Sequence, residues 1–194
     1  AAKSLAVKLT KVCNDLRLLA SGPRTGLSEL ILPQLQPGSS IMPGKVNPVI
    51  AEVLDQTCYQ VIGNDLAISM AVENGQLELN VMEPVIAFNI FNSFRFLTNA
   101  VNTFNEKLLK TMKANREQCQ YWVDHSVGVI TALLPHIGYE KCAATPREAY
   151  TTGEPVREII LKKQLVTKEA MTRILSPYEM THPGIAGGKD ALAK

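Results

Sequence analysis

Residues 83–113 read EPVIAFNIFNSFRFLTNAVNTFNEKLLKTMK, and this stretch indicates the class of the fold. Its apolar residues recur every three or four positions, which is the spacing of one face of an α-helix. That face contains Ile86, Ile90, Phe94, Leu97, Val101, Phe104 and Leu108. The pattern lasts for roughly eight turns. A helix this long cannot bury its apolar face within so short a chain, so we expect it to pack against other long helices.

Two further long helices are predicted before it. The first is already under way at the start of the chain and should end near Ser21-Gly22-Pro23, where glycine and proline stop a helix. Its apolar face contains Leu5, Leu9, Val12, Leu16 and Leu19. The second should run from Asn47, as N-cap, to about Asn74-Gly75. Its apolar face contains Ile50, Leu54, Cys58, Val61 and Ile62.

A polar stripe lies beside the apolar face of the second helix. Glu52, Gln56, Gln60 and Asn64 recur there every four residues. Such a stripe is either solvated or forms a polar seam inside a helical bundle, where the amides satisfy one another. The sequence leaves both interpretations open.

After residue 114 the pattern changes to short helices separated by Gly, Pro and Thr. They are predicted at residues 126–134, 146–152, 155–163 and 168–175, with Thr167 as the N-cap of the last one. No segment shows the sustained alternation of a β-strand. We therefore expect an all-α protein: a long-helix bundle segment over residues 1–114, followed by a small helical C-terminal domain over residues 115–194 with a flexible tail.

The composition excludes several classes of function. Twenty basic and eighteen acidic residues leave a net charge of +2 without a basic cluster, so we expect no nucleic-acid partner. The apolar runs are too short to span a bilayer, so we expect no membrane partner and a cytoplasmic protein. The four cysteines and three histidines are scattered along the chain, so we expect no metal site.

The segment GSSIMPGKVNP, residues 38–48, has the features of a ligand-binding loop. Gly38 and Gly44 give backbone freedom near its two ends, so the residues between them can approach a ligand closely or move as a lid. Ser39 and Ser40 place two hydroxyls between these glycines.

The end of this loop has the features of an anion site. Lys45 and Asn47 come just before a predicted helix start, where unpaired N–H groups attract a carboxylate or phosphate. The alternative is a plain turn that leads into a helix, with Asn47 as an ordinary cap and Lys45 solvated. The pattern of a nucleotide-binding P-loop is missing, which argues against nucleotide phosphate as the ligand.

The complete string of residues 38–48 resembles the signature loop of the fumarase/aspartase superfamily, without departure. The lead-in segments SGPR-x-GL (residues 21–27) and LP-x-x-QP (residues 32–37) resemble the same superfamily. Four further stretches are more similar to its aspartase branch than to its fumarase branch. These are VIGND (residues 61–65), GQLELNVMEPVI (residues 75–86), LTNA (residues 97–100) and VRE (residues 156–158). The resemblance covers nearly the whole chain.

The resemblance implies a carbon–nitrogen lyase of amino-acid metabolism that catalyses the reversible anti elimination of ammonia from L-aspartate to give fumarate, without a cofactor. Fumarate hydratase of the same superfamily is one alternative. An inactive helical oligomerisation module is the other. The general base maps to Ser39, with the adjacent Ser40 as its alternative, and Glu52 maps to the glutamate that orients a histidine. The implied substrate-binding residues are Ser40, Ile41, Met42, Lys45 and Asn47.

The superfamily builds each site from three subunits of a homotetramer, and its histidine precedes the signature loop. His125, His136 and His182 all follow the loop and match no such motif, so we interpret them as structural or surface residues. We therefore expect this chain to be the C-terminal portion of a longer enzyme, inactive alone, that contributes one of three regions to each site.

Overall fold

The computed structural model describes residues 1–188 and 191. The chain divides into two compact units, Ala1–Arg116 and Glu117–Lys194. Helices make up most of both units, which confirms the predicted all-α class. No helix of the described residues is long and apolar enough to cross a membrane.

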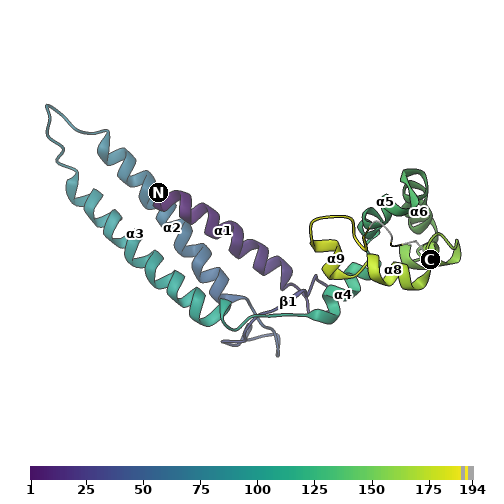
Figure 1. The fold of residues 1–194 in the computed structure, drawn as a ribbon. Coiled ribbons are helices and arrows are strands. Elements are labelled where there is room, and N and C mark those ends of the chain that lie inside the picture. Colours follow the sequence, from purple (N-terminus) through teal and green to yellow (C-terminus); the bar gives the residue numbers. More distant parts are fainter. Residues whose placement is uncertain (189–190, 192–194) are drawn as a thin grey trace. The chain divides into compact units, whose positions relative to one another are not determined.

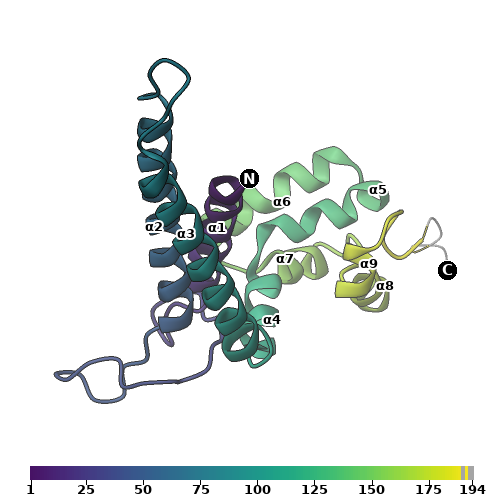
Figure 2. The same ribbon diagram turned by 90° about the vertical axis from the view of Figure 1, so that its left-hand side faces the viewer.

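The first unit is a bundle of three long helices, α1 (Ala2–Leu19), α2 (Val49–Val72) and α3 (Glu83–Phe104). The three helices lie side by side (Figures 1 and 2). α3 continues as a short π-helix, η1 (Asn105–Leu109). The long segment between α1 and α2 contains strand β1 (Leu30–Ile31), which pairs antiparallel with β2 (Lys113–Ala114). This pairing joins the segment before the GSSIMPGKVNP loop to the end of the third helix.

The core of the first unit lies between these helices. Its buried residues are Ala6, Cys13, Ala51, Leu54, Cys58, Val61, Leu97, Ala100, Phe104 and Leu108. Leu54, Cys58 and Val61 confirm the face predicted for the second helix. The face predicted for the first helix is partly wrong, because Leu5 and Val12 are exposed. The buried residues of α1 are instead the small Ala6 and Cys13, which allow two helices to approach closely.

A polar seam crosses the bundle between α2 and α3. The Gln60 side-chain amide donates to Asn64 Oδ1 at 2.8 Å, and Asn64 Nδ2 donates to Ser93 Oγ at 3.0 Å. Asn64 and Ser93 are both buried. Of the two interpretations of the polar stripe, the seam is therefore correct for Asn64, whereas Gln60 is exposed although it donates to Asn64.

Two expected boundaries in the first unit are wrong, and its short strands were missed. The second helix has Pro48 as its N-cap, because the Asn47 side chain bonds elsewhere in the loop. The third helix ends at Leu109, not near Lys113, because Lys113 pairs with β1. Strands were not expected at all, and two-residue strands are too short to show an alternating pattern.

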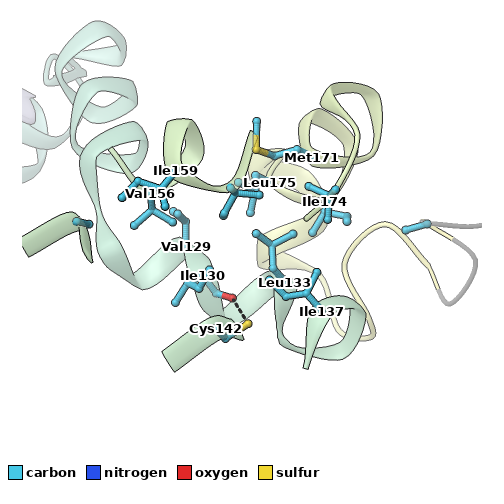
Figure 3. Packing of buried hydrophobic residues seen from close by; sticks show 14 residues of the cluster. Val129, Ile130, Leu133, Ile137, Cys142, Val156, Ile159, Met171, Ile174 and Leu175 are labelled. Atoms are coloured by element: carbon cyan, nitrogen blue, oxygen red, sulfur yellow. Dashed lines mark hydrogen bonds between the residues drawn. The ribbon is translucent and has the colours of Figure 1, made fainter. Parts of the chain in front are cut away.

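The second unit is built from short helices. They are α4 (Arg116–His125, beginning one residue before the unit), the 3₁₀ helix η2 (Val127–Leu133), α5 (Leu134–Ile137), α6 (Tyr139–Thr152), α7 (Val156–Lys162), α8 (Lys168–Ile174) and α9 (Pro177–Thr181). Figure 3 shows their apolar side chains meeting in one core, to which η2, α7 and α8 contribute. The Cys142 thiol lies 3.8 Å from the Ile130 carbonyl oxygen within it.

A capping threonine and a glycine explain where two of these helices begin. Thr167 caps α8 as predicted, because its hydroxyl oxygen accepts from Ala170 N–H at 3.2 Å. The helix predicted to start at Pro146 begins earlier, at Tyr139, and continues through the proline. Its start follows Gly138, whose φ of +81° breaks the preceding helix.

The expected flexible tail falls partly outside the described residues, at 189–190 and 192–194. The part that the structure describes is bound to the second unit. His136 Nε2 lies 2.8 Å from the Ala186 carbonyl oxygen, and Gly187 N–H donates to Glu179 Oε2 at 2.7 Å.

Candidate active-site loop

The GSSIMPGKVNP loop is closed at its neck by backbone and side-chain hydrogen bonds. Gly38 N–H donates to the Lys45 carbonyl oxygen at 2.9 Å, and Asn47 Nδ2 donates to the Gly38 carbonyl oxygen, also at 2.9 Å. A Cβ atom on Gly38 would lie 2.4 Å from the Lys45 carbonyl oxygen, so only glycine fits this crossing. Gly44 has φ of +79°, the left-handed conformation that glycine adopts without strain. The two glycines therefore set the shape of the loop.

The Ser39 hydroxyl lies at the centre of the loop's hydrogen bonds. Its Oγ accepts the N–H groups of Ile41 and Met42, each at 3.1 Å. Two N–H donors stabilise negative charge on an oxygen. Among the two serines of the loop, Ser39 is the one that the described hydrogen bonds place in such an environment.

A shallow hollow of about 370 Å³ lies beside Ser39. It is lined by Gln34, Leu35, Gln36, Pro37, Gly38, Ser39, Met42, Gly44 and Lys45. The loop thus brings Ser39 and Lys45 to one concave surface, together with the amides of Gln34 and Gln36. Ser40 and Asn47 do not line it. Gln36 belongs to the LP-x-x-QP segment that resembles the superfamily, whereas no pattern in the sequence indicated Gln34.

Glu52 lies in the first turn of α2, immediately after the loop. It is partly exposed. No histidine belongs to the first unit, since His125, His136 and His182 all lie after residue 116. His125 and His182 stack on Tyr121 and Tyr178 of their own helices. All three histidines form local contacts within the second unit, and their assignment as structural or surface residues stays a prediction.

The segment before the loop is anchored at a residue that sequence reasoning missed. Asn115 Nδ2 donates to the Ser28 carbonyl oxygen at 2.9 Å, and Asn115 N–H donates to the Glu29 carbonyl oxygen at 2.8 Å. Ser28 N–H in turn donates to the Ser21 carbonyl oxygen at 2.8 Å. Ser28 and Asn115 are 87 positions apart, so no local pattern could have found this contact.

No group of three or more His, Cys, Asp or Glu residues within residues 1–188 and 191 could hold a metal ion. The cysteines that are buried have low reactivity. Burial raises the pKa of the Cys13 thiol to about 12, and the nearby Asp55 carboxylate adds to the effect. Burial also raises the pKa values of Cys58 and Cys142.

Comparison with protein families gives two matches along the chain. Residues 1–63 match a family model described as lyase, and residues 129–182 match one described as fumarase C C-terminus. Aspartate ammonia-lyase of a Bacillus species is 56% identical over 97% of this chain and 40% of its own length. Aspartate ammonia-lyase of Helicobacter pylori is 54% identical over 93% of this chain and 39% of its own length. The chain thus spans about 40% of the length of these curated relatives.

Two solved lyase structures are similar to the chain in both sequence and fold. A fumarate lyase:delta crystallin from Brucella melitensis bound to cobalt has a TM-score of 0.88 and 48% identity, over 94% of this chain and 39% of that one. A class II fumarase from Schistosoma mansoni has a TM-score of 0.84 and 42% identity, over 94% of this chain and 38% of that one. By sequence and by fold, the chain belongs to the fumarase/aspartase superfamily of lyases, and it corresponds to a C-terminal portion of the aspartate ammonia-lyases.

Proposed function

We propose that this chain carries one region of the active site of an aspartate ammonia-lyase, which eliminates ammonia from L-aspartate to give fumarate, and adds it back in the reverse direction. The observation that carries the proposal is the Ser39 hydroxyl, which lies in an eleven-residue signature loop and accepts two backbone N–H groups. Curated relatives above 50% identity carry the name of this activity, which favours ammonia over water as the leaving group.

Ser39 is the general base of the proposed reaction. As an alkoxide it removes a proton from the carbon next to one carboxylate of L-aspartate, and the electrons of that C–H bond move into the carboxylate. The carbon–nitrogen bond then breaks on the opposite face, ammonia leaves, and the double bond of fumarate forms. The N–H groups of Ile41 and Met42 support the alkoxide, since a serine is otherwise too weak a base at neutral pH.

The loop also supplies the groups that hold a substrate carboxylate. Lys45 lines the hollow beside Ser39 and provides a positive charge where negative charge develops. Ile41, Met42 and Asn47 have the predicted role of carboxylate donors, but their donor groups bond within the loop in this structure. Ile41 and Met42 keep Ser39 Oγ as their acceptor while they support the alkoxide, so we propose that Lys45 and the second hydrogen of the Asn47 amide hold the carboxylate. Ser40 is a further hydroxyl for the same carboxylate.

Glu52 has the predicted role of orienting a histidine from another segment of the enzyme. The first unit holds no histidine that could be its partner. We propose that the missing groups come from other subunits of a homotetramer. The large apolar side chains that remain exposed on α3 support this assembly, since Phe88, Phe91 and Phe94 are 66%, 74% and 59% exposed. Phe94 was predicted on the buried face, and within this chain it is not buried.

The compartment that we propose is the cytoplasm. The thiols of Cys13, Cys58 and Cys142 are buried and free, which fits a reducing environment. The proposed reaction involves no metal or organic cofactor, because serine, lysine and backbone groups supply its proton transfer and charge stabilisation.

The test is a comparison of two additions to fumarate by the full-length protein. Fumarate is offered with ammonium ions and, separately, in water alone, and the products are identified by NMR. We expect L-aspartate from the first mixture and no malate from the second. Malate without L-aspartate would reject the ammonia-lyase in favour of a fumarase, the activity named for the similar Schistosoma structure. If the protein folds but forms neither product, both enzyme activities are rejected, and the remaining interpretation is an inactive helical oligomerisation module.

A further inference from the structure

A buried ion pair joins α1 to α2 close to the loop that both helices flank. Arg17 Nη1 lies 3.2 Å from Asp55 Oδ2. Arg17 is in the last turn of α1, and Asp55 lies in the second turn of α2. The Asp55 side chain is only 3% exposed, whereas Arg17 is 39% exposed. The carboxylate end of the pair is therefore buried, whereas the guanidinium end still reaches solvent.

This pair is poorly explained as a source of stability. Only one carboxylate oxygen of Asp55 is paired, since Oδ1 is buried without a hydrogen-bond partner among the described residues. Burial raises the pKa of Asp55, and the Arg17 guanidinium only opposes that effect. The nearby thiols of Cys13 and Cys58 are weak hydrogen-bond donors, so they do not replace the hydrogen bonds that water would donate to the Asp55 carboxylate. Apolar residues often replace both partners of a buried ion pair without loss of stability, so this pair points to specificity more than to stability.

The remaining contacts of α1 fix its position along α2 only weakly. Its buried residues are Ala6 and Cys13, whose small side chains interlock little with a neighbouring helix, and its Leu9 and Leu16 pack against the same core while only partly buried. The other ion pair between the two helices, Lys3 with Asp65 at 3.0 Å, is exposed on both sides and is worth little. Arg17–Asp55 is thus a directional contact between α1 and α2 whose carboxylate end is buried.

The register of these helices determines where the catalytic loop begins and ends. Residues 20–48 connect α1 to α2, and Glu52 precedes Asp55 by three residues, so the two lie on the same side of α2. A slip of α1 by one helical turn would displace the start of this segment by about 5 Å relative to its end. Even a shift of about 1 Å at a site can lower turnover by about 100-fold.

We propose that Asp55, through Arg17, is a positioning residue for the lyase reaction: the pair holds α1 and α2 in the one register that places Glu52 and the neck of the signature loop for catalysis. This inference rests on the proposed function, and it adds a residue outside the loop to the groups that the reaction requires. Asp55 touches neither substrate nor reacting atoms. Its effect should therefore appear in turnover and in the order of the loop, and not in the stability of the bundle.

The test uses four forms of the full-length protein: unaltered, Asp55→Leu, Asp55→Asn and Asp65→Asn. Each is assayed for kcat and KM with L-aspartate, for its thermal unfolding midpoint, and for hydrogen exchange of residues 36–52 by mass spectrometry. Asp65→Asn is the matched control, because it removes the exposed ion pair between the same two helices. Asp55→Asn keeps an oxygen that can accept from Arg17 and should restore function.

We expect Asp55→Leu to lower kcat by about 100-fold and to speed exchange in residues 36–52. The unfolding midpoint should not fall, because Arg17 is 39% exposed and its guanidinium stays solvated without its partner. Asp55→Asn and Asp65→Asn should stay within about threefold of the unaltered kcat. Unchanged turnover and exchange in Asp55→Leu would overturn the proposal. So would a lowered midpoint or a failure to fold, since either result would assign the pair to stability. If the unaltered protein has no lyase activity, the proposed function fails, and the exchange rates still decide the role of the pair.

Discussion

The neck of the signature loop can be tested by a single methyl group at Gly38. In Gly38→Ala the new Cβ would lie 2.4 Å from the Lys45 carbonyl oxygen, whereas ordinary contact begins at 3.4 Å. The neighbouring atoms are backbone, so the neck has to open by about 1 Å. Opening disrupts the two 2.9 Å hydrogen bonds that Gly38 makes with Lys45 and Asn47. The change leaves the helices untouched, so its effect should be confined to the loop.

The size of the effect follows from these contacts. Two hydrogen bonds of about 1 kcal/mol each amount to about 2 kcal/mol, which corresponds to about 30-fold in rate. A displacement of about 1 Å at a site gives about 100-fold. We therefore expect kcat/KM for L-aspartate to fall by about 30- to 100-fold in the full-length protein, measured as fumarate absorbance.

The matched control is Gly63→Ala, within α2. A Cβ at Gly63 meets nothing within 4 Å, and alanine favours a helix over glycine by about 1 kcal/mol. This variant should keep its activity and unfold at a slightly higher temperature. The reasoning about the neck would be refuted if Gly38→Ala retained kcat/KM within about threefold, or if Gly63→Ala lost as much activity as Gly38→Ala.

Two further predictions concern other parts of the chain. Thr167→Ala removes the cap of α8 and should destabilise the second unit by about 1 kcal/mol, seen as a lower unfolding midpoint. Thr172→Ala, in the same helix, removes only a hydroxyl that bonds the Lys168 carbonyl oxygen, and equal losses in both variants would contradict the capping role. Cys13, with a thiol pKa raised from 9.0 to about 12 by burial, should be about one part in ten thousand ionised at pH 8, against about one in ten when unfolded. Iodoacetamide should therefore label Cys13 only after denaturation, and rapid labelling of the native protein would contradict its burial.

The sequence predicted the helices with strong periodic patterns, because burial of one face sets both their length and their contacts. Leu54, Cys58 and Val61 are buried as the spacing of the second helix predicted. The first helix was harder to predict, because the apolar pattern places its largest apolar residues on the buried face. Close packing selected Ala6 and Cys13 instead, and exposed Leu5 and Val12.

The sequence predicted that the candidate site is a loop, but it did not predict the hydrogen bonds that set the shape of this loop. The glycines and serines of the signature loop indicated its backbone freedom and its hydroxyls. The hydrogen bonds that shape it were not predictable, because Asn47 could equally have capped α2. The anchor at Asn115 depends on a contact 87 residues away, which no local pattern encodes. The roles of the site residues themselves stay predictions.

The most direct test of the proposed chemistry compares the two adjacent serines of the loop. Ser39 Oγ accepts the N–H groups of Ile41 and Met42, and no such bond is described for Ser40. The measurement is kcat for fumarate formation at saturating L-aspartate, in full-length Ser39→Ala and Ser40→Ala proteins. We predict that Ser39→Ala lowers kcat by about 10²- to 10⁴-fold and that Ser40→Ala lowers it far less. Turnover by Ser39→Ala within about tenfold of the unaltered protein, or a larger loss in Ser40→Ala, would contradict Ser39 as the base.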